Sequence, residues 1–135
     1  METSCGVVLV NLDSILLLQY PQGHWDLPKG HLEVKDLNKR VAAQRELNEE
    51  TGINEIEFID GFEMRTEYNF RHKNKIVNKE VWWFLAETQQ LSVVLSHEHL
   101  NYIWLEWNQA KEMLTHQELV NSQSNLLLEH QLFSL

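Results

Sequence analysis

Three glutamates lie close together in the sequence and could act as one chemical unit. Glu46, Glu49 and Glu50 belong to a run of helix-forming residues, and their spacings of three and four place them on one helix face. At about 100° per residue, the three carboxylates span an arc of roughly 100°. Carboxylates this close repel one another unless a cation lies between them, and Mg²⁺ prefers oxygen ligands. The spacing therefore favours a divalent metal site, although a solvated helix face can show the same spacing.

The residues around the glutamates favour the metal site. A loop that contains Gly30 precedes the helix, and Gly52 follows it at the position where helices often end. Arg45 can pair with a neighbouring carboxylate and hold it in orientation. The sequence contains no Asp-rich calcium loop, no phosphate-binding P-loop and no dinucleotide-binding glycine motif.

The elements that position this segment follow from the hydrophobic pattern and from the turn residues. Short apolar runs predict strands over residues 4–10, 15–19, 56–64, 80–87 and 102–107. Asp36 is the expected N-cap of a helix over residues 37–51, and further helices are expected over residues 108–114 and 122–132. The polar residues 71–79 are expected to connect two strands. Strands interleaved with helices predict a single mixed α/β sandwich domain over residues 1–135.

The composition limits the partners of this chain. Its 135 residues contain 20 Asp and Glu against 11 Lys and Arg, a formal net charge of −9. Such a surface repels nucleic-acid backbones and anionic membranes, and it would need divalent cations to hold a phosphate substrate.

No apolar run approaches the roughly 20 residues of a membrane helix, and the N-terminal segment lacks the basic part of a secretory signal. The single cysteine, Cys5, favours a reducing compartment, so we expect a cytoplasmic protein, with a monomer as the favoured state.

At the glutamate segment the sequence resembles the Nudix hydrolase family, whose signature is GX5EX7REUXEEXGU with U a bulky apolar residue. Gly30 matches the first glycine, and residues 45–53 (RELNEETGI) match the second half at every defined position. Asp36 stands where the family has Glu, and eight residues rather than seven separate it from Arg45. Whether Asp36 supports the loop and Arg45 as the family's Glu does is left open by the sequence. The resemblance implies a Nudix α/β/α sandwich with a mixed sheet, and hydrolysis of a nucleoside diphosphate linked to another moiety.

The resemblance also implies roles for the residues of this segment. Glu46, Glu49 and Glu50 are expected to bind Mg²⁺ or Mn²⁺, with the backbone carbonyl of Lys29 or Gly30. Glu46 is the expected base, and Arg45 orients the acids. Two further residues have alternatives: Glu98 either completes the metal site or is a solvated acid, and His31 either donates to a phosphate oxygen or stabilises the loop.

Two segments, WDLPKGHLE at residues 25–33 and SHEHLNYIW at residues 96–104, are similar to the diadenosine tetraphosphate hydrolase branch of this family. The similarity implies attack of water at phosphorus, with ATP and AMP as products from diadenosine tetraphosphate. It implies substrate-binding roles for four residues. Tyr68 and Tyr102 would stack on adenine, although they could instead be half-buried sheet residues, and Lys79 and Lys29 would contact phosphate.

Several alternatives remain open at this point. The same chemistry could remove pyrophosphate from 5′-triphosphorylated RNA, or the chain could be a non-catalytic nucleotide-binding module that retained the fold. His97 and His99 are expected to be structural rather than metal ligands, and Cys5 to be a small buried hydrophobe. The basic cluster at residues 71–75 either is a solvated loop or steers a polyphosphate toward the site.

Overall fold

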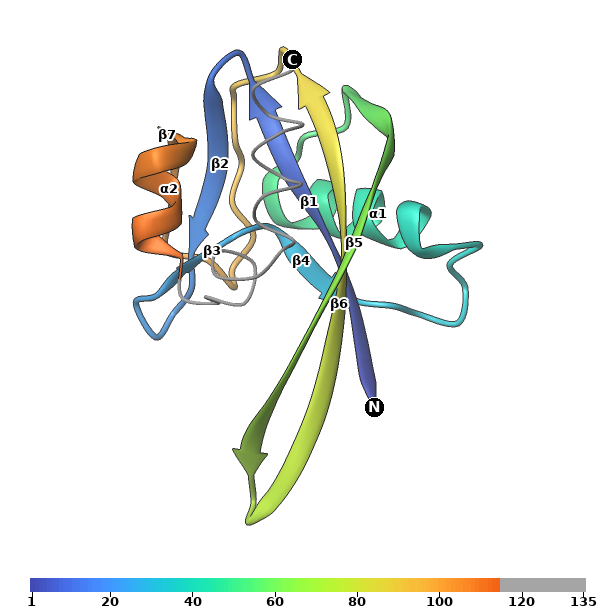
Figure 1. Ribbon diagram of the computed structural model, residues 1–135. Helices are drawn as coiled ribbons and strands as arrows, with labels where there is room; N and C mark the ends of the chain where they lie inside the picture. The colour runs from blue at the N-terminus through green and yellow to red at the C-terminus, as the bar shows by residue number, and fades with distance from the viewer. Residues whose placement is uncertain (115–135) are drawn as a thin grey trace.

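A seven-stranded mixed sheet forms the centre of the computed structural model, which describes residues 1–114 (Figure 1). The strands are ordered β3-β2-β1-β6-β5, with β4 beside β1 and β7 beside β2. Strands β1 and β6 are parallel, and the other pairs are antiparallel. The bounds are β1 Glu2–Asn11, β2 Ser14–Gln19, β3 Trp25–Asp26, β4 Lys29–His31, α1 Lys39–Thr51, β5 Ile56–His72, β6 Lys75–Thr88, β7 Asn101–Glu106 and α2 Trp107–Met113.

Strand β1 is the central strand and positions the glycine loop. It is buried from Ser4 to Val10, and β6 pairs along one of its edges. The other edge is shared, because β4 pairs with its start and β2 with its end. Between them, the Val7 N–H donates to the carbonyl of Pro28 at 3.0 Å. The segment that carries Lys29 and Gly30 is therefore fixed against the centre of the sheet.

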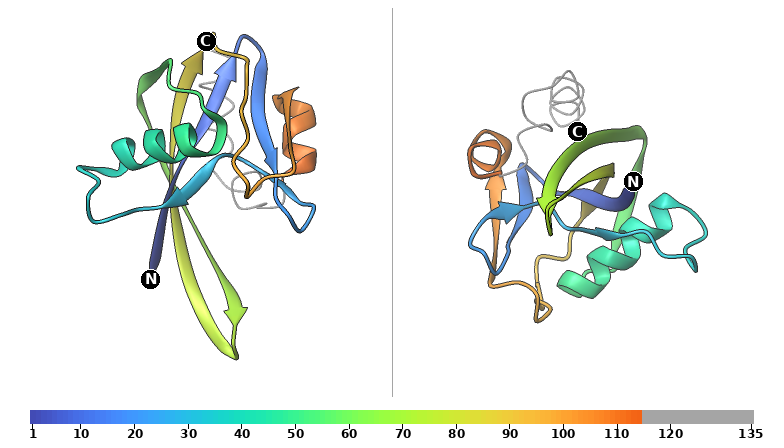
Figure 2. Two further views of the ribbon diagram at one scale, coloured as in Figure 1. Left: turned by 180° about the vertical axis from the view of Figure 1, so that it is seen from behind. Right: turned by 90° about the horizontal axis from the view of Figure 1, so that it is seen from below.

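The two helices cover opposite faces of the sheet. Trp83 of β6 packs in the buried cluster that contains Trp107 and Ala110 of α2. The next residue, Phe84, packs in the cluster that contains Ala43 of α1. Because successive side chains of a strand point to opposite faces, α1 and α2 lie on different sides, as Figure 2 shows. This confirms the predicted mixed α/β sandwich.

The lone cysteine belongs to the core on the α1 side. Cys5 is fully buried, beside the small residues Ala42 and Ala43 that let α1 approach the sheet. This agrees with its predicted role as a small hydrophobe. Within residues 1–114, no helix is long and apolar enough to cross a membrane.

The predicted start of the first helix is wrong, whereas its end is confirmed. Helix α1 begins at Lys39 rather than residue 37, and its N-cap is Asn38, whose side chain accepts a hydrogen bond from the Val41 N–H at 2.9 Å. Asp36 is engaged elsewhere and caps nothing. At the other end Gly52 adopts a left-handed conformation with φ 72°, and its N–H donates to the Asn48 carbonyl at 2.8 Å.

The predicted connection over residues 71–79 is also wrong, because these residues form the outer end of a long hairpin of β5 and β6. Strands β5 and β6 continue until only Lys73 and Asn74 remain between them, with φ of 50° and 64°. Two positive φ angles are typical of the tight turns that join antiparallel strands. The hairpin extends beyond the rest of the sheet, where its residues are mostly exposed (Figure 1). A strand exposed on both faces has no hydrophobic alternation, so the pattern did not indicate it.

The last elements differ from the prediction by one residue. Strand β7 ends at Glu106, and Trp107 is already the first residue of α2, which was expected to begin at Asn108. Trp107 is buried in the core, and this fixes the start of the helix. The helix predicted over residues 122–132 lies outside the described residues.

Candidate active site

Arg45 connects the glycine loop to the helix through a set of charged contacts. Its Nε and Nη2 donate to the two oxygens of Asp36 at 2.9 and 3.0 Å, and Nη2 also donates to the carbonyl of His31 at 3.0 Å. On the helix side, Nη1 donates to Glu46 at 3.0 Å and to Glu49 at 3.2 Å. These anions raise the pKa of Arg45, so its charge is permanent. Arg45 thus holds the loop and two of the three glutamates in one arrangement.

Asp36 supports this loop despite being one methylene shorter than glutamate. Besides its two bonds to Arg45, it accepts a hydrogen bond from the Glu33 N–H at 2.8 Å. The bonds from Arg45, and then that from Glu33, lower the pKa of Asp36 to about 2. The question that the sequence left open is therefore answered, because Asp36 holds both the loop and Arg45.

Gly30 leaves the space that the Glu46 carboxylate occupies. A Cβ atom on Gly30 would overlap the carboxylate of Glu46, so any other residue would displace it. Partial burial of Glu46 raises its pKa, an effect that the nearby Arg45 opposes. The loop backbone and this carboxylate are consequently in close contact, as expected if both face one ion.

Glu50 is the most buried of the three glutamates. It is 4% exposed, and its Oε2 lies 3.1 Å from Nε2 of His99. Its Oε1 is buried and has no hydrogen-bond partner among residues 1–114. Burial raises the pKa of Glu50 to about 7, with the nearby His99 acting in the opposite direction. A buried carboxyl with an unpartnered oxygen is costly, and a bound cation would compensate for this cost.

Glu49 is directed to Arg45, with about half of its side chain exposed. In the described part of the chain, no three His, Cys, Asp or Glu side chains are already grouped to hold one ion. The pairing of Arg45 with Glu46 and Glu49 accounts for this, since these carboxylates are turned toward a guanidinium. The residues still fit a divalent ion, because Glu50 has an unpartnered buried oxygen and Glu46 lies against an open glycine.

The segment that carries Glu98 is attached to the end of α1. The Ser96 N–H donates to the carbonyl of Glu50 at 3.1 Å, and the Val94 N–H donates to that of Thr51 at 2.8 Å. Glu98 is exposed, and its N–H donates to Ser96 Oγ at 3.4 Å. The structure therefore brings this segment to the helix end, where Glu50 lies.

The two predicted phosphate lysines lie on the strands that flank β1, Lys29 on β4 opposite Gly6 and Lys79 on β6 opposite Glu2. Lys29 is almost buried, with its Nζ 3.8 Å from Asp26. Lys79 is half-buried on β6, and its pKa is lowered by burial and next by the charge of Lys29. An anion bound near Lys79 would act in the opposite direction, because it favours the charged form of a lysine.

The other predicted substrate residues lie on separate strands. Tyr68 is half-buried on β5, opposite Lys79, and packs against the core on the α2 side. Tyr102 lies on β7, opposite Leu18, and is 37% exposed. His31 is exposed, and the contact that it makes with Arg45 uses its backbone carbonyl.

Tyr20 was not predicted from the sequence, although it lies within this group. Its ring is stacked on that of His24, with 5.0 Å between the ring centroids, and is nearly perpendicular to that of His99, with 4.7 Å between the centroids. The Nζ of Lys29 lies 5.6 Å from the centroid of the Tyr20 ring. The Tyr20 hydroxyl is buried without a hydrogen-bond partner among the described residues, and Glu50 is the nearby charge that most raises its pKa, after burial. The signal available in the sequence was an aromatic residue at the end of a buried strand, directly before the Pro- and Gly-containing loop.

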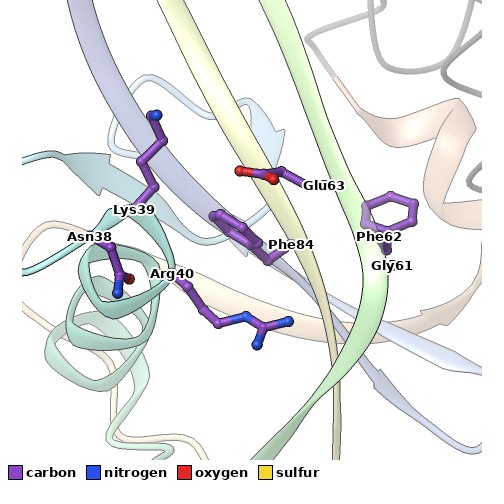
Figure 3. A pocket seen from close by; sticks show the side chains of 7 residues that line it. All are labelled: Asn38, Lys39, Arg40, Gly61, Phe62, Glu63 and Phe84. Carbon is purple, nitrogen blue, oxygen red and sulfur yellow. The ribbon is translucent and has the colours of Figure 1, made fainter.

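A separate cavity of about 460 Å³ lies at the start of α1, beside the irregular part of β5. Figure 3 shows its lining, which contains no carboxylate of the glutamate group: Asn38, Lys39, Arg40, Gly61, Phe62, Glu63 and Phe84. Its cations are already engaged, because Lys39 lies over the Trp82 ring at 4.4 Å and Arg40 pairs with Asp60 at 3.2 Å. The candidate active site is therefore the glutamate group and not this cavity.

Comparisons with known proteins agree with this assignment. A family profile described as NUDIX domain matches residues 2–127. The mouse asymmetrical bis(5′-nucleosyl)-tetraphosphatase is 38% identical over 110 residues, which cover 77% of this chain and 71% of that protein. An RNA pyrophosphohydrolase of Caulobacter vibrioides is 30% identical over 125 residues, with 79% and 71% coverage.

The fold agrees as well. A crystal structure of a C. elegans Ap4A hydrolase binary complex superimposes with a TM-score of 0.78 and 29% identity, over 96% of this chain and 99% of that one. Together with the profile match and the arrangement of Gly30, Arg45 and the three glutamates, this similarity shows that the chain belongs to the Nudix hydrolase family.

Proposed function

We propose that the protein hydrolyses diadenosine tetraphosphate to ATP and AMP in the presence of Mg²⁺ or Mn²⁺. The observation that carries this proposal is the unpartnered buried oxygen of Glu50, which belongs to a group of carboxylates and is influenced by the charge of Lys29. Such a site combines carboxylates that suit a metal ion with a lysine that suits a phosphate group. The relative from mouse, which is named for the asymmetrical tetraphosphatase activity, supports this choice of substrate.

Glu46, Glu49, Glu50, the carbonyl of Gly30 and Glu98 are the residues that would hold the metal. When bound, the metal offsets the negative charge of the phosphates and lowers the pKa of the attacking water. Glu49 would have to turn away from Arg45 to join this set, because its two oxygens now face the guanidinium at 3.2 Å. Arg45 remains attached to Asp36 and to the loop, so the helix and the loop keep their alignment.

The chain's own residues would bind the substrate and move the proton. Lys29 and Lys79 would contact the phosphates, and Tyr68 and Tyr102 would stack on adenine. Glu46 would accept a proton from the attacking water, since partial burial makes its carboxylate more basic than an exposed glutamate. His31 would donate to a phosphate oxygen.

The stacked adenosine would determine where the chain is cut. Fixing one nucleoside sets the register of the four phosphates relative to the carboxylates, so that water reaches one phosphorus rather than any of them. We expect attack at the phosphorus attached to the departing nucleoside, which gives AMP and ATP.

Chromatography of the products from a panel of dinucleotides tests this proposal. Diadenosine tetraphosphate should give ATP and AMP, and in heavy-oxygen water the label should enter AMP. Two ADP as the main product would reject the asymmetric cut. Label in ATP would retain the asymmetric cut but move the attacked phosphorus.

A second candidate function is the removal of pyrophosphate from 5′-triphosphorylated RNA. The similarity to the Caulobacter enzyme favours it, whereas the net charge of −9 disfavours an RNA partner. Release of pyrophosphate from 5′-labelled RNA, at a kcat/KM above that for diadenosine tetraphosphate, would support this candidate.

A non-catalytic module would be expected to have lost part of the glutamate motif, which is intact here. The cytoplasmic location and the monomeric state remain predictions.

A further inference from the structure

The end of α1 and the segment over residues 96–99 form one connected unit. Ser96 is attached through its backbone to the carbonyl of Glu50. Its hydroxyl accepts a hydrogen bond from the Glu98 N–H at 3.4 Å and lies 3.0 Å from Nδ1 of His99. The same serine therefore links two of the residues proposed to hold the metal, through a histidine for Glu50 and through the backbone for Glu98.

The two ring nitrogens of His99 have different neighbours, with Ser96 at Nδ1 and Glu50 at Nε2. The side chain of His99 is fully buried, and Nε2 lies 3.1 Å from Glu50 Oε2. Among residues 1–114, Nε2 makes no hydrogen bond, and the Glu50 carboxylate at 3.1 Å is its ion-pair contact. The Ser96 hydroxyl can donate a hydrogen bond to Nδ1, and the ring proton is then on Nε2, the nitrogen nearer to the carboxylate. The Tyr20 ring, whose centroid lies 4.7 Å from that of His99, limits the movement of the imidazole.

We propose that His99 is a positioning residue, which holds Oε2 of Glu50 so that Oε1 remains free to bind the metal ion. This inference rests on the proposed metal site. It follows from the division of the Glu50 carboxylate, in which one oxygen has a buried partner and the other has none. The residues behind metal ligands commonly fix their orientation, and their loss typically costs about 10- to 100-fold in metal affinity or activity.

The alternative is that His99 only fills space in the core. Both roles predict that a replacement lowers the unfolding temperature, so stability alone cannot separate them. They differ in the effect on metal binding, and in the effect of a side chain that restores the N–H but not the ring. Glutamine is such a side chain, since its amide nitrogen extends about as far from the backbone as Nε2 of histidine.

The experiment measures Mn²⁺ binding to the full chain by electron paramagnetic resonance, without nucleotide. His99→Leu should weaken Mn²⁺ binding by about 10- to 100-fold. His99→Gln should recover most of the loss, and Ser96→Ala should weaken binding by about fivefold, as expected for one lost hydrogen bond. His97→Leu is the matched control, because it makes the same change at an exposed neighbouring position and should bind Mn²⁺ like the wild type.

The outcomes separate this inference from the proposed function. A wild type that binds no Mn²⁺ would overturn the metal site and, with it, the role of His99. Binding by the wild type and equally by folded His99→Leu would overturn only the positioning role. The same conclusion would follow if His99→Gln bound Mn²⁺ as weakly as His99→Leu. If His99→Leu does not fold, His99→Gln and Ser96→Ala decide: unchanged binding in Ser96→Ala together with a 10- to 100-fold loss in His99→Gln contradicts the proposal.

Discussion

The two ends of the carboxylate face of α1 are built differently. At the Arg45 end, charged groups are paired, since Arg45 binds Asp36, Glu46, Glu49 and the loop carbonyl of His31. At the Glu50 end, burial is greater and pairing is incomplete, because the Glu50 carboxylate has a buried oxygen without a partner among the described residues. Paired charges hold a structure together, whereas an unpaired buried charge lowers stability and is typical of a functional site. The Arg45 end is therefore the support, and the Glu50 end has the unpartnered oxygen to which we propose that a metal ion binds.

Neutralising the Glu50 end should give the largest effect on activity. Glu50→Gln and Glu49→Gln each keep the side-chain volume but remove one anionic ligand. We expect kcat to fall by at least about a hundredfold, the scale of lost charge stabilisation in a transition state. Glu50→Gln should also raise the unfolding temperature of the metal-free protein, since a buried amide replaces a buried acid.

Glu63→Gln is the control for this pair, because Glu63 lines the separate cavity at the start of α1. Its activity should equal that of the wild type. Turnover near that of the wild type in both Glu49→Gln and Glu50→Gln, with Mg²⁺ present, would refute the metal assignment.

Adding a methyl group at Gly30, beside the Glu46 carboxylate, should reduce both stability and activity. Gly30→Ala places a methyl group where the Glu46 carboxylate lies. Because that carboxylate is the end of a flexible side chain, we expect a loss of at most about 1 kcal/mol in the free energy of unfolding, below the usual range for overpacking, together with reduced kcat. Denaturant unfolding and steady-state kinetics measure the two effects. Unchanged kcat would show that Glu46 can move without cost, against its proposed place between loop and metal.

Tyr68 and Tyr102 belong to neither end of the carboxylate face and are proposed to bind the substrate. If Tyr68 and Tyr102 stack on adenine, replacement of either by Ala should weaken binding by about 1–3 kcal/mol, whereas Phe should have a small effect. Calorimetry with AMP or ATP measures the change. Loss of folding in Tyr68→Ala with unchanged affinity of the folded fraction would instead assign Tyr68 to the core, where it packs on the α2 side.

The smallest effect is a pH dependence at the Arg45 end. Arg45 lowers the pKa of Asp36 to about 2, so the fold favours the ionised form. The stability from this pair is present above about pH 4, the ordinary range of an aspartate, and is lost as the pH falls through about 2. The difference in unfolding temperature between the wild type and Asp36→Asn should therefore shrink between pH 4 and pH 2.

Asp60→Asn is the matched control for that titration. Asp60 pairs with Arg40 at 3.2 Å but is 94% exposed, and exposed ion pairs contribute little. Its difference from the wild type should stay small at every pH. An equal pH dependence in both variants would show that the Asp36 pair has no special role.

The helix that carries the glutamates was predictable, because spacings of three and four and a terminal glycine are local signals. Its start was not, since Asp36 is a good N-cap in isolation, but Arg45 and the backbone of Glu33 engage it in the folded chain. Local rules cannot include a partner nine residues away. For the same reason the meeting of Tyr20, Glu50 and His99 was not predicted, because it depends on how three distant segments pack. The long hairpin escaped prediction because its outer half is exposed on both faces.

The buried position of Cys5 gives this protein an internal reporter of its own opening. The thiol is fully enclosed on the α1 side of the sheet, and burial raises its pKa to about 11. A thiol reacts with alkylating reagents only as the exposed thiolate, so the folded chain should be inert to them. Because the chain has one cysteine, each labelling event marks one excursion of the central strand from the core. The labelling rate then gives the free energy of that excursion under native conditions, and its slowing by added Mn²⁺ would measure the coupling between metal binding and the stability of the sheet.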